Sequence, residues 1–299
     1  MEVRTIIAPT DFSDVSYNAC LYAAKMAHDV QAQLILLHVM ELPITVSEFP
    51  VLDPVYDETN IGNKLRELKA SLLNETGEKI QIHTASILGS VEYELKELCN
   101  IEKPFAVVMG THSYNMLERF FVGSTAAYSA RHLHYPVLIV PAGASYKPLR
   151  KIALACDLKN IYSIPLEEIE KMLNAFGASL DVFHVHTKQT KFDESSVEYT
   201  LLRDRLLHLD AKFFTVENTD VQRGIATLAT RHDTDLILII PRKHGPFHKA
   251  WSNEFIFYSS VPVMAVHEGG VVQKSGEEPS CGCSLESCGC GIPHASLNQ

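Results

Sequence analysis

Glycine and hydroxyl residues in the stretch "VVMGTHSYNMLERFFVGSTAAYSARHL" have types and spacing that suit phosphate groups. Gly110 follows an apolar, strand-like run, and Gly123, Ser124 and Thr125 open a segment of helical spacing. Glycine lets backbone approach a ligand without a Cβ in the way. The first turn of a helix adds N–H groups and the positive end of the helix dipole, which attract anions. The stretch therefore predicts a phosphate site, with a plain turn and helix cap as the alternative.

Parallel strands would bring such groups to one edge of a sheet. The expected strands of the first half are "RTIIAPT", "QLILLHV", "IQIHTAS", "FAVVMG" and "PVLIVP". Segments of helical spacing separate them, and Ser13 and Ser90 stand where helix N-caps are expected. This alternation predicts an α/β fold with a doubly wound parallel sheet, covered by helices on both faces. Ligands bind beyond the carboxyl ends of such strands, where Asp11 and Gly110 are expected to meet.

The pattern is repeated along the chain. "RKIALACD" repeats "VRTIIAPTD" and "LDVFHVH" repeats "LILLHVM", so that Asp157 follows Asp11, and His184 follows His38, by 146 residues each. "DLILIIP" and "VPVMAV" repeat "FAVVMG" and "YPVLIV" at a shorter interval. We therefore predict two tandem domains, residues 1–144 and 149–268, joined near "PAGASYKPLR". Residues 269–299 lack periodicity and are predicted to be a flexible tail.

Composition limits the classes of function. The chain has 299 residues, of which 46% are apolar, which is ample for two packed cores. Its longest apolar runs fall short of the roughly 20 residues of a membrane span, and no signal peptide is recognised, so a cytoplasmic protein is expected. A net charge of -10 without any extended Lys/Arg run argues against nucleic acid as a partner.

The chain resembles the universal stress protein family, of the tandem two-domain type, over about residues 1–267. The most specific feature is the family's ATP motif: a glycine, two residues, a second glycine, nine residues, then glycine followed by Ser or Thr. Here the motif is Gly110, two residues, Ser113, nine residues, then Gly123 and Ser124. Ser113 replaces the second glycine and adds a side chain where backbone would face phosphate.

The resemblance implies an adenine nucleotide site, with ATP, alone or with Mg²⁺, as the cofactor. Asp11 would hydrogen-bond the ribose or base region, the backbone of Val39 would hold the adenine, and Met109 would pack against it. Ser124 and Thr125 would hold phosphates. The full set that the resemblance implies is Pro9, Thr10, Asp11, Val39, Met109, Gly110, His112, Ser113, Gly123, Ser124 and Thr125.

The second half departs from this pattern. Pro241 is placed at the position of the first glycine, and Trp251 falls near the entrance of the corresponding helix. Proline lacks an N–H group and tryptophan is bulky, so ATP is not expected to bind there. The repeated His38 and His184 end apolar strands, and we interpret them as structural residues rather than catalytic bases.

The tail "CGCSLESCGCGIPH" contains Cys281, Cys283, Cys288 and Cys290. Four thiolates close together could enclose a soft metal ion such as zinc or cuprous copper. Free thiols on a disordered tail are the alternative, because the spacing differs from that of common zinc fingers.

The resemblance implies an ATP-binding protein with a nucleotide-dependent regulatory role in stress response. The family's last strands associate about a two-fold axis, so "PVLIVP" and "PVMAVH" are expected to pair in an intramolecular pseudo-dimer, and a homodimer stays open. A slow ATPase is the rival function, but no paired carboxylates for magnesium and no Walker-type lysine accompany the loop. A third alternative is an interaction module that does not use nucleotide.

Overall fold

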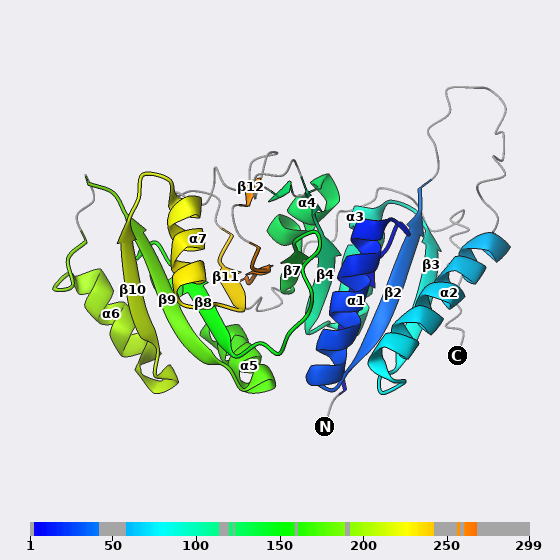
Figure 1. Ribbon diagram of the computed structural model, residues 1–299, viewed down its shortest axis with the longest axis horizontal. Helices are drawn as coiled ribbons and strands as arrows, with labels where there is room; N and C mark the ends of the chain where they lie inside the picture. The colour runs from blue at the N-terminus through cyan, green and yellow to red at the C-terminus, as the bar shows by residue number, and fades with distance from the viewer. Residues whose placement is uncertain are drawn as a thin grey trace, which may run out of the picture.

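Strands from both halves of the chain form one continuous sheet of ten strands, with helices on both faces (Figure 1). The structure is a computed structural model that describes residues 3–41, 58–113, 120–121, 123–158, 161–188, 192–241, 256–257 and 260–267. Within these residues, no helix is both long enough and apolar enough to cross a membrane. The α/β class and the parallel sheet expected from the sequence are confirmed.

The first half, up to Val140, contains all the strands and helices expected from the sequence. Its strands in the main sheet are β1 (Arg4–Pro9), β2 (Ala32–Met40), β3 (Ile82–Leu88), β4 (Ala106–Gly110) and β7 (Val137–Val140). Its helices are α1 (Asp14–Asp29), α2 (Glu58–Thr76), α3 (Val91–Glu102) and α4 (Ser124–His132). Two short strands, β5 (His112–Ser113) and β6 (Phe120–Phe121), lie between β4 and α4. Across the sheet these strands lie in the order β3-β2-β1-β4-β7. The chain therefore adds strands on one side of β1 up to β3, and then on its other side with β4 and β7.

The second half, from Lys151, repeats this strand order. Its strands are β8 (Lys151–Ala155), β9 (Ser179–His186), β10 (Lys212–Glu217), β11 (Leu236–Ile239) and β13 (Val263–Ala265), with a short β12 (Ile256–Phe257). Its α-helices are α5 (Leu166–Phe176), α6 (Val197–Leu206) and α7 (Val221–Arg231), and its 3-10 turns are η2 (Ile161–Ser163) and η3 (Leu207–Leu209). The order β10-β9-β8-β11-β13 matches that of the first half. We had not assigned β10 from the sequence.

Alternating side chains divide the core into two layers. One buried cluster joins one face of the sheet to α1, α2, α5 and α6, and includes Ile6 and Ala8. The other joins the opposite face to α3, α4 and α7, and includes Ile7. This period of two follows from the strand pleat, and it explains why both faces of each central strand read as apolar in the sequence.

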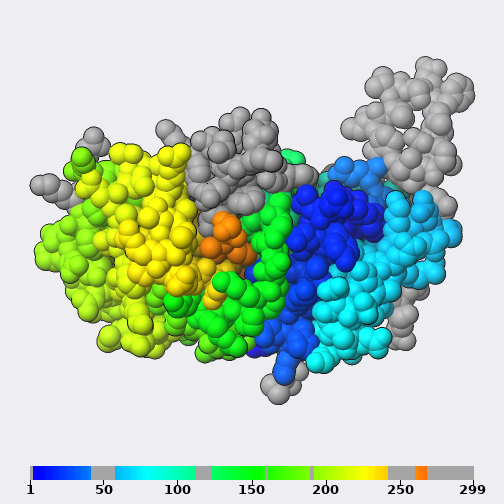
Figure 2. All heavy atoms as spheres, in the orientation of Figure 1, coloured from blue at the N-terminus to red at the C-terminus, as the bar shows by residue number. Residues whose placement is uncertain are grey.

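The two halves meet at their last strands, as the sequence predicts. β7 and β13 pair antiparallel, with Ile139 opposite Val263 and Val137 opposite Ala265. The other strand pairs of the ten-stranded sheet are parallel. In Figure 2 the orange segment that includes β13 lies between the yellow residues of the second half and the green residues near the middle of the chain.

The connection between the halves is attached to both of them. The Tyr146 hydroxyl donates to Asp29 Oδ2 at 2.7 Å in the first half. In the second half, Asp235 Oδ1 lies 2.8 Å from Lys147 Nζ. Asp235 Oδ2 accepts hydrogen bonds from the backbone N–H groups of Arg150 and Lys151 at 2.9 Å each. These contacts attach the connection to the first half at Tyr146 and to the second half at Lys147, Arg150 and Lys151.

Candidate functional site

Thr10 organises the turn that follows β1. Its backbone N–H donates to the Leu37 carbonyl at 2.8 Å, which continues the pairing with β2. Its hydroxyl lies 3.0 Å from Ser16 Oγ and accepts the Phe12 N–H at 3.0 Å. Phe12 has a left-handed φ of 63°, which is unusual for a bulky residue and is held here by these bonds. Thr10 is buried, so it shapes the turn rather than exposing its hydroxyl.

Asp11 is the exposed acid of this turn. One of its oxygens accepts from the Ser13 N–H at 3.0 Å and from the Ser13 hydroxyl at 2.6 Å. Partial burial raises the pKa of Asp11, but hydrogen bonds from Ser13 and Ser16 outweigh it and hold that pKa below its usual value. The carboxylate is therefore ionised at neutral pH and fixed at the carboxyl end of β1, next to Pro9.

The end of β2 presents backbone groups beside this turn. The Leu37 carbonyl accepts from Thr10, whereas the Met40 carbonyl accepts from Gly89 on the β3 side at 3.0 Å. Because backbone groups alternate between the two neighbouring strands, the N–H and carbonyl of Val39 point over the end of β1. β2 continues through Met40, one residue past the end expected from the sequence. The Val39 backbone is therefore placed to bind a planar ligand edge.

The repeated histidines are structural in their contacts. His38 Nδ1 donates to the Thr10 carbonyl at 2.8 Å, and its ring packs on Phe12 with centroids 4.6 Å apart. In the second half, His184 Nδ1 donates to the Cys156 carbonyl at 2.9 Å in the same way. Each imidazole thus fixes the end of the neighbouring strand, which agrees with the interpretation from the sequence.

Gly110 is required by a helix and not by a sharp turn. It ends β4, and a Cβ added to it would lie 2.7 Å from the Val15 carbonyl oxygen of α1. Its φ is not among the positive values of the described residues. The glycine lets the start of α1 approach the carboxyl end of β4.

The residues on either side of Gly110 point to the opposite face of the sheet. Met109 is buried in the cluster that also contains Ala126 and Ala127 of α4, so its side chain lies on the face of the sheet that α4 covers. Thr111 is 1% exposed, and its Oγ1 has no hydrogen-bond partner among the described residues. We had not singled out the Thr111 hydroxyl from the sequence. Its burial without a partner is a signal that only the fold provides.

The N-terminus of α4 differs from those of the other helices. Gly123 is its N-cap and makes no side-chain cap bond, and the first turn has no acidic residue. Of the seven α-helices in the described residues, the other six begin with a side-chain cap, an acidic first turn or both. A Cβ at Gly123 would meet nothing within 4 Å, so the space beside it is open. Within its own first turn and N-cap, α4 therefore supplies no negative group to the positive end of its dipole.

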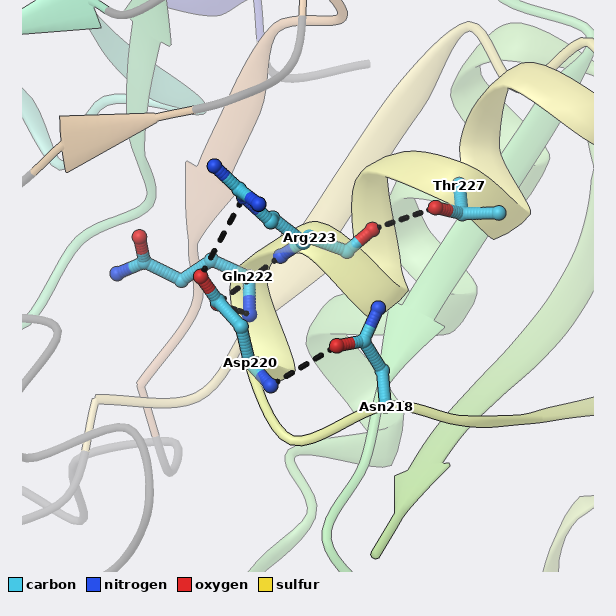
Figure 3. Close-up of polar contacts among 5 residues, drawn as sticks. All are labelled: Asn218, Asp220, Gln222, Arg223 and Thr227. Atoms are coloured by element: carbon cyan, nitrogen blue, oxygen red, sulfur yellow. Dashed lines mark hydrogen bonds and ion pairs between the residues drawn. The ribbon is translucent and has the colours of Figure 1, made fainter.

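Helix α7 lies between β10 and β11, as α3 lies between β3 and β4, and it illustrates a helix N-terminus that is capped (Figure 3). Asp220 caps α7, because its Oδ1 accepts the backbone N–H groups of Gln222 and Arg223 at 3.0 and 3.2 Å. Asn218 accepts the Asp220 N–H at 2.9 Å and steadies the cap. The first turn of α7 thus already holds a carboxylate where an anionic ligand would otherwise lie.

The structure brings the strand-borne members of the predicted site to one edge of the sheet. Asp11 follows β1, Val39 is the second-last residue of β2, and Gly110 ends β4, and these three strands are neighbours in the sheet. Ser124 and Thr125 open α4, which connects to the next strand, β7. The backbones of His112 and Ser113 form β5, but their side chains lie outside the description. Trp251 and the tail cysteines Cys281, Cys283, Cys288 and Cys290 also lie outside the described residues. Within those residues, no group of three His, Cys, Asp or Glu side chains could hold a metal ion.

The register of the sheet corrects one correspondence between the halves. Ile7 pairs with Val107, and Ala153, which follows Ile7 by 146 residues, pairs with Ile237. Val107 and Ile237 are therefore equivalent, and three residues further along their strands Ile240, and not Pro241, is the equivalent of Gly110. Our expectation for Pro241 was one residue out of register. Ile240 is buried, so the second half has a large side chain where the first half has none.

Comparison with known proteins gives a consistent result. A model of the universal stress protein family matches residues 2–141. A universal stress protein of Methanocaldococcus jannaschii is 30% identical over 142 residues, which cover 46% of this chain and 81% of that protein. The crystal structure of a universal stress protein from Archaeoglobus fulgidus superposes with a TM-score of 0.67 at 14% identity, over 90% of this chain and 100% of that one. A functionally unknown protein from Pseudomonas aeruginosa gives a TM-score of 0.55 at 13% identity, over 89% and 93%. At such identities the two structures show a shared fold, which extends across both halves.

Proposed function

The chain belongs to the universal stress protein family, and on that premise we propose that its first half binds ATP and that this binding regulates the protein in stress response. The phosphates lie at the first turn of α4, and the adenine lies at the carboxyl ends of β1 and β2. The second half does not bind ATP in this way and packs against the first as a pseudo-dimer.

One observation carries the proposal. The first turn of α4 has neither a side-chain cap nor an acidic residue, although the other six described α-helices have at least one of these. Unpaired N–H groups and the helix dipole together bind phosphate oxygens. Ser124 and Thr125 add two hydroxyls there, and Gly123 leaves the approach open.

Two further groups suit the base and the ribose of a nucleotide. The Val39 backbone offers a donor and an acceptor to the edge of the adenine. Asp11 is ionised and accepts from the ribose or base region. These groups fit ATP. Bound Mg²⁺ would be held through the phosphates, because no carboxylate cluster for it exists in the described residues.

The domain limits follow the same proposal. Residues 1–144 form the ATP-binding domain, residues 149–268 form a degenerate copy, and residues 269–299 form a separate tail. The shared strand order supports the copy, since both halves place their first strand beside the fourth and the second. Buried Ile240, in the place of Gly110, supports its loss of phosphate binding.

The test is a calorimetric titration of the full chain with ATP and with adenosine. We expect one ATP per chain. Gly123→Asp should cap α4 and stabilise the fold by roughly a few tenths of a kcal/mol, because Asp is a slightly better N-cap than Gly. Its carboxylate should nevertheless repel phosphate and weaken ATP binding at least about tenfold, or about 1.4 kcal/mol.

Gly123→Asn is the matched control, because Asn caps a helix as well as Asp but adds no charge. It should weaken ATP binding less than Gly123→Asp does, and adenosine should bind all three proteins alike. Equal ATP affinity for Gly123→Asp and the unaltered chain would remove α4 from the phosphate site. A chain that binds neither ATP nor adenosine would instead be an interaction module that does not use nucleotide.

A further inference from the structure

A small sheet joins the loop of one half to the corresponding loop of the other. Its strand order is β12-β6-β5. Strands β5 and β6 pair antiparallel, with His112 opposite Phe121 and Ser113 opposite Phe120. Strand β12 of the second half pairs antiparallel with the other edge of β6, with Ile256 opposite Phe121. In Figure 1, β12 lies beside α4 above the centre of the main sheet.

The connections that meet here have equivalent places in the two halves. β5 and β6 lie between the fourth and fifth main strands of the first half, β4 and β7. β12 lies between the fourth and fifth main strands of the second half, β11 and β13. The antiparallel pair β7–β13 brings these two connections together. The small sheet is thus a second junction between the halves, separate from the main sheet.

This junction is attached directly to the start of α4. Phe121 ends β6, and Gly123 is the N-cap of α4 only two residues later. Since successive Cα atoms are 3.8 Å apart, the Cα atoms of these two residues lie within about 7.6 Å of each other. Any displacement of β6 therefore moves the first turn of α4, whose N–H groups we assign to phosphate.

A hairpin with two residues in each strand is not stable by itself, and a third strand supplies the missing pairing. Strand β5 contains Ser113, which replaces the second glycine of the ATP motif. An extended strand accommodates serine as readily as glycine. The replacement is therefore consistent with a loop that is held by strand pairing and not by the flexibility of glycine.

We propose that β12 of the second half positions β6 and, through it, the first turn of α4, so that phosphate binding at α4 and the β12–β6 pairing stabilise each other. The proposal rests on the proposed function. It gives the second half a role in nucleotide binding without a nucleotide site of its own, through Ile256 and Phe257. Coupling of this kind is reciprocal, so ATP must also stabilise β12.

The test replaces both β12 residues by proline in the full chain, Ile256→Pro with Phe257→Pro, because proline cannot donate to a ladder. We expect ATP affinity to fall about tenfold as preorganisation of the loop is lost, with adenosine affinity nearly unchanged. The control is Glu194→Pro. Glu194 is exposed, and it occupies the second position of a turn closed by the Ser196 N–H and the Asp193 carbonyl, where proline is favoured.

Amide exchange on the unaltered chain gives a second measurement, which does not depend on a variant that folds. ATP should slow exchange in a peptide that covers residues 256–257, and adenosine should not. An unchanged ratio of ATP to adenosine affinity in the double-proline protein, or unchanged exchange with ATP bound, would overturn the coupling and leave ATP binding intact. If the unaltered chain binds no ATP, the proposed function fails and this inference fails with it.

Discussion

The first strands of the two halves end in the same set of contacts, but the helices that follow them begin in different places. Thr10 N–H donates to Leu37 at 2.8 Å, and Cys156 N–H donates to Phe183 at 2.9 Å. Phe12 and Leu158, 146 residues apart, both have left-handed backbone, with φ of 63° and 59°. The shared scaffold therefore consists of a strand end, a histidine beneath it and a left-handed turn.

The difference lies just beyond this turn. In the first half α1 begins at Asp14, so that Val15 contacts Gly110. In the second half the residue 146 positions after Val15 is Ile161, which lies in a 3-10 turn, and α5 begins only at Leu166. Ile161 and Ile240 belong to one buried cluster. Once the helix starts later, glycine is no longer needed at the end of the fourth strand, and a large apolar side chain fills the space.

The shared scaffold and the phosphate position that we propose are therefore separable. The histidine contact survives in both halves, with Nδ1 donating to a carbonyl at 2.8 and 2.9 Å. Within the described ranges, the close approach of a helix to a glycine at the end of the fourth strand is found only between α1 and Gly110 of the first half. A ring covers each histidine by a different route, Phe12 over His38 and Phe192 over His184, with centroids 4.6 and 5.6 Å apart.

The largest expected effect comes from Gly110→Ala. The new Cβ would lie 2.7 Å from a backbone oxygen that cannot move without shifting α1, so we expect a loss of about 3 kcal/mol in the free energy of unfolding. Gly123→Ala adds the same methyl group where nothing lies within 4 Å and should cost at most about 1 kcal/mol. Urea denaturation measures both. Equal losses would show that the α1 contact does not explain the glycine.

The sequence predicted the scaffold well because its signals are local. Strand periodicity located every main strand of the first half, and the spacing of Asp11 and His38 from their repeats predicted a repeated arrangement that the hydrogen bonds of Thr10 and Cys156 display. β10 is not among the predicted strands, although its sequence "KFFTVE" is rich in residues that favour strands.

The reason for Gly110 could not be predicted, because it depends on a distance to Val15, which lies far away in the sequence. The register error at Pro241 has a similar cause, since apolar runs do not show which residues are paired. The β12–β6 pairing joins residues of the two halves and has no local pattern at all. The start of α4 at Gly123 could be predicted from the sequence. That its N-terminus differs from those of the other helices could be recognised only by comparing their caps in the structure.

A second expected effect concerns His267, which lies five residues after Pro262, as Pro141 lies five residues after Pro136 in the first half. Burial, with repulsion from His134 and His132, lowers the pKa of His267 to about 4, although a hydrogen bond with the Ala130 backbone opposes this. Its Nε2 has no partner among the described residues. Between its usual pKa and about 4, the unfolded chain binds a proton here and the folded chain does not.

Stability should therefore fall as the pH is lowered through that window, by up to about 3 kcal/mol from this group. His267→Gln should flatten that part of the profile, as measured by denaturation at several pH values. His28→Gln, which changes an exposed histidine of α1, should leave the profile as it is. A steep profile that persists in His267→Gln would assign the acid sensitivity to other groups.

The smallest expected effect concerns the second strand of each half. Ile35 of β2 and Asp181 of β9 are 146 residues apart, and both are buried, at 4% and 7% exposure. Burial raises the pKa of the Asp181 carboxyl, and the charges of His232, Lys212 and Lys151 only partly offset this. At neutral pH the ionised carboxylate therefore costs the fold more than its positive neighbours return.

Asp181→Ile, which restores the residue type of the first half, should stabilise the protein by about 1 kcal/mol at pH 7, since replacing buried charges with apolar side chains is often stabilising. The raised pKa fixes the sign of the pH dependence. The penalty appears as the pH rises through the folded pKa, so the gain should shrink in acid, where Asp181 is protonated. Asp181→Asn separates charge from shape and should recover only part of the gain. A less stable Asp181→Ile at pH 7 would mean that the attraction of the surrounding cations contributes more than burial of the carboxylate costs.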